Sequence, residues 1–260
     1  MSAILELHDV KRSFGGVTAV AGLSFAVEEH EILGLIGPNG AGKTTIVNLI
    51  SGFIKPSAGT VLLNGTNVTG LSAYRLARRG LVRTFQSTTV FSGRTVRENA
   101  LRGAFLSSHP GWISEFLATP KARRQHEEAE AVVDELLHEL ELASVAEQVA
   151  SGLPYGMQKA LGIVIALAAR PKIILLDEPV AGLSAEEASH VRDTLIKVRN
   201  RGVTVVVIDH NMRFISGLCD RVVVVNQGKE LAQGKPDIVL ADPAVIEAYL
   251  GASYHQARAS

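Results

Sequence analysis

The segment GPNGAGKT, from Gly37 to Thr44, combines residue types that can hold phosphate groups. It fits the pattern G-x-x-x-x-G-K-[ST], follows the apolar EILGLI and precedes TTIVNLIS, which has the pattern of a helix. Phosphate oxygens need several close donors, and glycines let backbone amides turn inward at a helix N-terminus, whose dipole favours anions. We therefore expect Lys43 to neutralise the β- and γ-phosphates of a nucleotide and the Thr44 hydroxyl to bind magnesium. The alternative is a glycine-rich turn without a ligand.

Two acids, Asp177 and Glu178, follow the apolar run IILL at the end of a strand of the buried type. In a parallel sheet, this end of the strands normally carries the site. Asp177 suits magnesium, directly or through water, and Glu178 suits a general base for water that attacks the γ-phosphate. The alternative is that the strand ends in acids only because it reaches solvent there.

Two further polar residues follow strand-like runs, Gln86 in LVRTFQ and His210 in VVVIDH. Gln86 is a neutral side chain that can contact magnesium and orient water, although a single glutamine carries little information by itself. A single histidine is more often structural than catalytic, unless a γ-phosphate lies within its reach. Both residues therefore depend on the context that the other motifs provide.

The elements that must position these residues follow two patterns. From Ile4 to Gly65, short β-prone runs alternate with turns, with one helix from about Lys43 to Ser51. Helical signals then dominate to about Ala169: TVRE, from Thr95 to Glu98, has the spacing of a capping box, and an apolar stripe at helical period follows, formed by Val132, Val133, Leu136, Leu137 and Leu140. Beyond it, KIILLD and VTVVVID flank a helical segment, which predicts parallel strands with a crossover helix.

Composition excludes several classes of protein. Among 260 residues, Lys plus Arg and Asp plus Glu number 26 each, so the broad positive field of nucleic-acid binding is absent and no nucleic-acid partner is expected. The longest apolar run, Ala160 to Ala169, is far shorter than the roughly 20 residues of a membrane helix. The N-terminus has no signal-peptide pattern and Cys219 is the only cysteine, so the expected location is the cytoplasm.

The order of these motifs resembles the ATP-binding cassette (ABC) family over nearly the whole chain. The resemblance implies an α/β P-loop ATPase with a mixed sheet, an antiparallel β subdomain and an inserted helical subdomain. It implies ATP and Mg²⁺ as ligands, Thr44, Gln86 and Asp177 at the metal, and Glu178, His210 and Gln86 in catalysis. By the same resemblance, nucleotide contacts come from Phe14 on the adenine, from the phosphate loop (Gly37, Pro38, Asn39, Gly40, Ala41, Gly42, Lys43, Thr44, Thr45) and from LPYGMQ (Leu153, Pro154, Tyr155, Gly156, Met157, Gln158).

LPYGMQ occupies the place of the family's signature loop, usually Leu-Ser-Gly-Gly-Gln, which binds the γ-phosphate of an ATP held by a second subunit. Three positions depart from the family pattern. Pro154 replaces a serine and removes a hydroxyl, although proline is tolerated at a helix start. Ser184 in AGLS replaces an aspartate, and Asn211 follows His210 where an aspartate is common. Phe14 also has an alternative role as an ordinary core aromatic.

The motifs GLVRTFQ, GTVLLNG, LDEPVAGLS and DPAVIEAYLG narrow the resemblance to ATP-binding subunits of branched-chain amino acid importers. This implies a cassette over 1–251 with a helical subdomain at about 87–169, and we expect a loose tail over 252–260. The cargo assignment rests on overall resemblance, so urea, amides and lipopolysaccharide export stay open. A soluble cassette ATPase acting on ribosomes or DNA is less favoured, because a second cassette, a long coiled coil and a basic face are all missing from the sequence. A catalytically inactive regulator is opposed by Lys43, Asp177, Glu178 and His210.

The resemblance also implies partners: a second cassette subunit, identical or different, two membrane-spanning permeases, and indirectly a periplasmic solute-binding protein. The subunit is then peripheral, on the cytoplasmic side of the inner membrane. Segment 104–125 lies where these importers carry an insertion, with Trp112, Ile113, Phe116 and Leu117 on one helical face and a basic cluster after them, formed by Lys121, Arg123 and Arg124. Three roles of this segment remain open: packing on its own helical subdomain, contact with the permease, and adsorption to anionic lipid.

Overall fold

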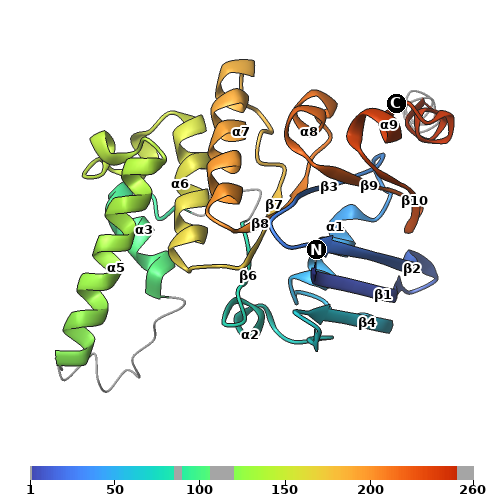
Figure 1. Ribbon diagram of the computed structural model, residues 1–260, viewed down its shortest axis with the longest axis horizontal. Helices are drawn as coiled ribbons and strands as arrows, with labels where there is room; N and C mark the ends of the chain where they lie inside the picture. The colour runs from blue at the N-terminus through green and yellow to red at the C-terminus, as the bar shows by residue number, and fades with distance from the viewer. Residues whose placement is uncertain (1, 85–89, 106–119, 251–260) are drawn as a thin grey trace.

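The computed structural model describes residues 2–84, 90–105 and 120–250, and it confirms the α/β fold. Its centre is a six-stranded sheet (Figure 1) in which five neighbouring strands run parallel and the edge strand β10 runs antiparallel to β9. The strand order is β10 (Lys229–Gly234), β9 (Arg221–Asn226), β3 (Ile32–Ile36), β8 (Thr204–Ile208), β7 (Ile173–Asp177) and β6 (Leu81–Arg83).

The apolar runs of the central strands have side chains on both faces of the sheet, each of which contacts a different core. In β3, Ile32 and Ile36 belong to one core and Leu33 and Leu35 to the other. Because side chains alternate along a strand, a continuous apolar run is the sequence of a sheet that is covered on both faces. Strands β7 and β8 divide their residues in the same way.

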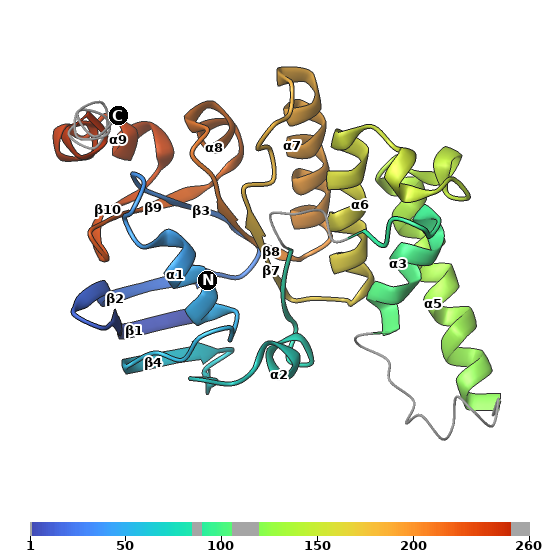
Figure 2. The same cartoon turned by 180° about the vertical axis from the view of Figure 1, so that it is seen from behind.

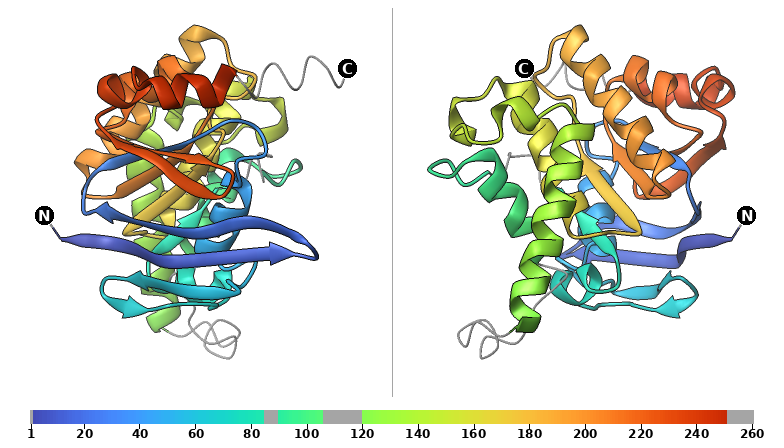
Figure 3. Two further views of the ribbon diagram at one scale, coloured as in Figure 1. Left: turned by 90° about the vertical axis from the view of Figure 1, so that its right-hand side faces the viewer. Right: turned by 60° about the vertical axis from the view of Figure 1, so that its left-hand side comes forward.

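A second sheet is antiparallel and packs below the first with helix α1 (Lys43–Ile50) between them (Figure 2). Its strands, in spatial order, are β2 (Val17–Glu28), β1 (Ala3–Phe14), β4 (Ala58–Leu63) and β5 (Thr66–Asn67). Figure 3 shows the long β1–β2 hairpin crossing the molecule. Ile46 and Val47 of α1 share one core with residues of both sheets, so burial of the apolar face of α1 fixes the helix directly behind the predicted phosphate loop.

The remaining helices fall into two groups (Figures 1 and 2). One group lies beside the end of the central sheet where β6 and β7 lie, and it contains α3 (Val96–Phe105), α5 (Pro120–Glu139) and α6 (Tyr155–Ala168), with the short η1 (Ala143–Val145) and η2 (Ala150–Gly152). The other covers the central sheet and contains α7 (Ala185–Asn200), α8 (Met212–Leu218) and α9 (Pro236–Leu240), whereas α2 (Ala73–Ala77) lies near β6. No helix within the described ranges is long and apolar enough to cross a membrane.

Two local predictions for the helical group are confirmed. The Thr95 hydroxyl accepts from the Glu98 amide at 3.1 Å and the Glu98 carboxylate accepts from the Thr95 amide at 2.8 Å, which completes the capping box of α3. Four residues of the apolar stripe on and after α5, Val133, Leu136, Leu137 and Leu140, are buried, and Val132 packs partly buried against the same core. α3 packs tightly on α6, because a Cβ added to Gly103 would lie 2.0 Å from the Ile165 carbonyl oxygen. The predicted apolar face of the insertion (Trp112, Ile113, Phe116 and Leu117) lies in 106–119, outside the described residues. The predicted basic cluster lies at the start of α5, where Arg123 and Arg124 are exposed.

Candidate active site

The phosphate loop joins the central strand β3 to helix α1, and its first and last glycines have no room for a side chain. Gly37 has φ 155°, and a Cβ there would lie 2.1 Å from the carbonyl oxygen of Val225. Gly42 has φ 103° at the N-cap of α1, and its Cβ would lie 2.5 Å from the carbonyl oxygen of Ala19. The two glycines therefore let the chain turn tightly between three strands and begin the helix.

Lys43 begins α1, and its side chain folds back over this loop. Its Nζ donates to the carbonyl oxygens of Gly37 at 2.6 Å and Pro38 at 2.9 Å. Partial burial lowers the pKa of Lys43, and the nearby carboxylates of Glu178 and Asp177 act in the opposite direction. The ammonium thus lies between the loop and the predicted catalytic acids. Thr44 is exposed at the second residue of the helix.

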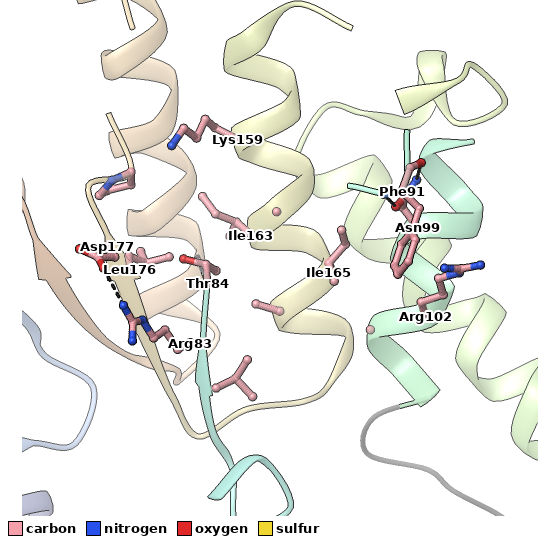
Figure 4. A pocket seen from close by; sticks show the side chains of 15 residues that line it. Arg83, Thr84, Phe91, Asn99, Arg102, Lys159, Ile163, Ile165, Leu176 and Asp177 are labelled. Carbon is pink, nitrogen blue, oxygen red and sulfur yellow. Dashed lines mark hydrogen bonds and ion pairs between the residues drawn. The ribbon is translucent and has the colours of Figure 1, made fainter. Parts of the chain in front are cut away.

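Asp177 ends β7 and forms an ion pair that was not predicted from the sequence. Its Oδ2 accepts from Nη2 of Arg83 at 2.8 Å, and the two side chains are only 10% and 9% exposed (Figure 4). Arg83 also donates to the Oδ1 of Asn48 at 2.6 Å and to the Oγ of Ser51 at 3.2 Å. Because Asn48 and Ser51 lie on and just after α1, this arginine connects the aspartate strand to the phosphate-loop helix.

Glu178 and His210 come together at the carboxyl ends of β7 and β8. The Glu178 Oε1 and the His210 Nδ1 are 3.7 Å apart, and their side chains are 30% and 64% exposed. Glu178 has φ 49°, an unfavourable backbone region for a residue with a Cβ, and its amide donates to the carbonyl oxygen of Ile208 at 2.7 Å. His210 is therefore an exposed residue beside the predicted base, which opposes the purely structural alternative.

The residue before this histidine is a buried acid that the sequence reading did not single out. Asp209 is 1% exposed, its Oδ1 accepts from the Asn211 amide at 2.9 Å, and its Oδ2 has no hydrogen-bond partner among the described residues. Burial raises the pKa of Asp209. The Asn211 side chain accepts from the Phe214 amide at 3.1 Å and so caps α8, which gives its departure from the family pattern a structural role.

The LPYGMQ segment forms the N-terminus of α6, where Pro154 is the N-cap residue. Leu153 is buried and its carbonyl oxygen accepts from the side-chain amide of Gln158 at 2.9 Å. Pro154, Tyr155 and Met157 are exposed. The segment thus presents helix-start backbone to solvent, which is the arrangement that favours an anion.

Ser184 follows this site on the chain and caps α7 by a capping box. Its Oγ accepts from the Glu187 amide at 3.2 Å, and the Glu187 carboxylate accepts from the Ser184 amide at 2.9 Å. The same carboxylate lies close to α6, since a Cβ on Gly156 would be 3.0 Å from Glu187 Oε1. Hydrogen bonds from the Ser184 amide and hydroxyl, and from the Gly156 amide, lower the pKa of Glu187. The S-A-E-E spacing carries this signal, but the sequence reading missed it.

Of the predicted residues Phe14 and Gln86, the structure describes only Phe14. Phe14 ends β1 and is 45% exposed, with the Arg12 guanidinium 4.7 Å above its ring, so it is not the core aromatic of the alternative interpretation. Gln86 lies outside the described residues. A cavity of about 510 Å³ opens beside Asp177 between β6, α3 and α6 (Figure 4). Its lining includes Arg83, Thr84, Phe91, Asn99, Arg102, Lys159, Ile163, Ile165, Leu176 and Asp177.

The residues present fit a magnesium nucleotide. The loop from Gly37 to Gly42 keeps its tight path only with glycine at both ends, because a Cβ at either end would collide with the backbone of β9 or β2. A magnesium ion that is held mainly by substrate phosphates and water needs few protein ligands, such as one hydroxyl and one carboxylate. Thr44 and Asp177 supply those two groups from adjacent elements.

Comparisons with known proteins agree with this geometry. The family model described as "ABC transporter" matches residues 20–181, and a model described as "Branched-chain amino acid ATP-binding cassette transporter" matches residues 229–255. The chain is 39% identical to the high-affinity branched-chain amino acid transport ATP-binding protein BraF of Pseudomonas aeruginosa, over 95% of this chain and 98% of that protein.

It is 33% identical to the lipopolysaccharide export system ATP-binding protein LptB of Haemophilus influenzae, over 97% of this chain and 99% of that protein. Among solved structures, an ATP-binding cassette of an ABC transporter in its ADP conformation has a TM-score of 0.85 at 30% identity, covering 96% of this chain and 100% of the other.

Proposed function

Because this chain belongs to the ATP-binding cassette (ABC) transporter family, we propose that it drives the import of branched-chain amino acids. Family membership makes it an ATP-hydrolysing subunit that works with membrane permeases. The observation that carries the cargo proposal is the 39% identity to BraF over 95% of the chain. The second model, matched at residues 229–255, supports the same cargo.

We assign the following roles to the residues of the site. Amides of the Gly37–Thr45 loop and the Lys43 ammonium bind the phosphates, and the ammonium must leave the carbonyl oxygens of Gly37 and Pro38 to reach them. Thr44 and Asp177 would hold a magnesium ion, which would supply positive charge against the phosphates. Glu178 accepts the proton of the attacking water, and His210 orients the γ-phosphate from its place 3.7 Å from that carboxylate. Gln86 remains a proposed magnesium and water contact.

The signature segment serves the ATP of a second cassette. Pro154, Tyr155 and Met157 are exposed at the start of α6, so a partner subunit can approach them. The Gly156 amide, which donates to Glu187, must leave that carboxylate to reach a phosphate of the partner's ATP. Two ATP molecules are then enclosed between two cassettes that face each other head to tail. Binding of ATP closes this dimer and hydrolysis reopens it, which moves the two permeases. The partner cassette is a second copy or a related subunit.

Transport in a reconstituted system tests the cargo. We expect the full chain, assembled with its permeases and a periplasmic binding protein in proteoliposomes, to take up leucine, isoleucine and valine in an ATP-dependent way. Glu178→Gln should abolish uptake while the assembly persists. Uptake of none of these amino acids by an intact, ATP-hydrolysing assembly would contradict the cargo proposal and favour another substrate, of which lipopolysaccharide export is suggested by the 33% identity to LptB.

The insertion over 104–125 is proposed to contact the permease. A deletion of Ser107 to Thr119 should leave the ATP affinity of the isolated subunit unchanged and weaken the stimulation of its ATPase by the reconstituted permease. This deletion lies outside the described residues and spares the folded part of α3 and α5. Normal stimulation would refute the permease contact, whereas loss of folded protein would favour packing of the segment on its own helical subdomain.

A further inference from the structure

Lys159 is a buried cation whose role no motif explains. It lies on α6, one turn after the start of the helix, and is only 8% exposed. Lysine is rarely so buried unless its ammonium is paired, because removing a charge from water is costly. The contacts of the Lys159 ammonium therefore indicate what this residue does.

The ammonium of Lys159 contacts two segments of the proposed site. Its Nζ lies 3.5 Å from the carbonyl oxygen of Glu178, and it lies 5.3 Å from the centroid of the Tyr155 ring, within the range of a cation–π interaction. Figure 4 shows the side chain leaving α6 toward the end of β7, where Asp177 lies. Lys159 therefore joins the signature segment to the catalytic segment within one chain.

The backbone conformation of Glu178 depends on contacts of this kind. Its φ of 49° is unfavourable for a residue with a Cβ, and such conformations persist only where surrounding contacts hold them. The amide donates to the Ile208 carbonyl oxygen at 2.7 Å, and the carbonyl oxygen accepts from the Ala181 amide at 3.2 Å and from the Lys159 ammonium at 3.5 Å. Together, these contacts determine where the Glu178 carboxylate lies relative to His210.

The aromatic ring completes the connection. A Cβ on Gly182 would lie 3.5 Å from Tyr155 Cε1, so the ring packs against the loop that follows β7 as well as against the lysine. A displacement of Tyr155 therefore reaches Glu178 by two paths, through Lys159 and through this loop. Tyr155 belongs to the segment that, under the proposed function, contacts the ATP of the partner subunit.

We propose that Lys159 is a positioning residue that couples the two ATP sites: it ties the Glu178 main chain to the signature segment of the same chain. The inference rests on the proposed composite site. When the partner's nucleotide engages the signature segment, Lys159 sets the place of the base that acts on this chain's own nucleotide. It touches neither the substrate nor the reacting atoms.

Steady-state ATPase kinetics of the full chain test this role with Lys159→Met, which keeps the length and apolar part of the side chain. We expect kcat to fall about tenfold, KM to change less than about twofold, and the Hill coefficient for ATP to move toward one. Lys159→Arg keeps the charge and should retain most of kcat. Arg221→Met is the control, because Arg221 is also partly buried and donates to a backbone carbonyl oxygen, that of Ala26, but begins β9 at the amino ends of the parallel strands, opposite the site.

A kcat for Lys159→Met within about twofold of the wild-type value would overturn the proposal. Equal losses in the methionine and arginine variants, with unchanged KM and melting temperature, would also overturn it. If Lys159→Met does not fold, Lys159→Gln carries the same expectation. An inactive wild-type chain would contradict the proposed function itself. If the wild type is active, Glu178→Gln is inactive and Lys159→Met has normal activity, only this inference is contradicted.

A double-mutant cycle with Tyr155→Leu tests the connection to the signature segment. If the ring acts on Glu178 through Lys159, the loss of kcat in the double variant should be clearly smaller than the product of the two single losses. A double loss equal to that product would mean that the two residues act independently, and it would refute the coupling between the segments.

Discussion

Removal of the Arg83 side chain should destabilise this protein more than removal of any surface cation. Arg83 and Asp177 are 9% and 10% exposed, and Arg83→Met leaves the carboxylate without its partner. It also removes donors from Asn48 at 2.6 Å and Ser51 at 3.2 Å. Breaking a buried pair by removing one partner typically costs about 3 to 5 kcal/mol.

The lower end of that range applies here. The Lys43 ammonium interacts electrostatically with Asp177, so part of the negative charge stays compensated when Arg83 is removed. We therefore expect a loss of about 3 kcal/mol in the free energy of unfolding. With a urea dependence of about 3 kcal/mol per molar, the midpoint of urea unfolding should fall by about 1 M.

The assay is urea unfolding followed by circular dichroism, without nucleotide or magnesium. Arg192→Met is the control, because Arg192 pairs with Asp193 at 3.1 Å where the two side chains are 39% and 58% exposed, and such a pair contributes at most about 1 kcal/mol. The double variant Arg83→Met/Asp177→Asn should be more stable than Arg83→Met alone, because it leaves no uncompensated charge. An Arg83→Met midpoint equal to that of Arg192→Met would refute this account of the ion pair.

Three other substitutions test separate parts of the structure. Gly37→Ala should weaken nucleotide binding at least about tenfold, because its Cβ would meet the Val225 carbonyl oxygen at 2.1 Å, and a titration with a fluorescent ATP analogue measures the loss. Pro154→Ser restores a hydroxyl toward the partner's γ-phosphate, which should strengthen ATP-driven dimerisation by about 1.5 to 3 kcal/mol if well aligned, measured by analytical ultracentrifugation. Burial raises the pKa of Asp209 in the folded state. The folded protein therefore gains stability from the neutral carboxyl at a pH below the usual pKa of about 4, and it loses this stability as the pH rises through the raised pKa. Asp209→Asn should therefore raise the melting temperature at neutral pH, and a gain of the same size at about pH 4 would contradict this assignment.

The sequence predicted the elements of the site whose information is local. The phosphate loop, the strand that ends at Asp177 and Glu178, and the capping box at Thr95 and Glu98 each occupy one short segment, so residue types and spacing identify them. The family assignment followed from the order of these segments along the chain. These predictions needed no knowledge of which segments are neighbours in space.

Contacts between segments could not be predicted in the same way. Arg83 meets Asp177 because β6 lies beside β7 with Arg83 level with Leu175, and only the register of the two strands brings them together. Lys159 reaches Glu178 from α6 for a similar reason. Strands β9 and β10 were not singled out from the sequence, although their apolar valine run fits a buried strand.

Ser184 shows a different limit. Compared with the family pattern it is a departure, because an aspartate is usual at this position. In the structure it is the N-cap of α7, with a reciprocal contact to Glu187, and serine and aspartate are both favoured at that position. Residue type marked this position as a change, whereas the hydrogen bonds at the N-cap accept either side chain.

ATP-dependent dimerisation of Glu178→Gln tests the composite site most directly, because this variant keeps the phosphate contacts and lacks the base. Size-exclusion chromatography with ATP and magnesium should give a dimer. Adding Gly156→Asp, which places bulk and negative charge at the signature segment, should return the protein to a monomer that still binds ATP at its own phosphate loop. A dimer that persists in the double variant, or a Glu178→Gln variant that hydrolyses ATP at the wild-type rate, would contradict the account.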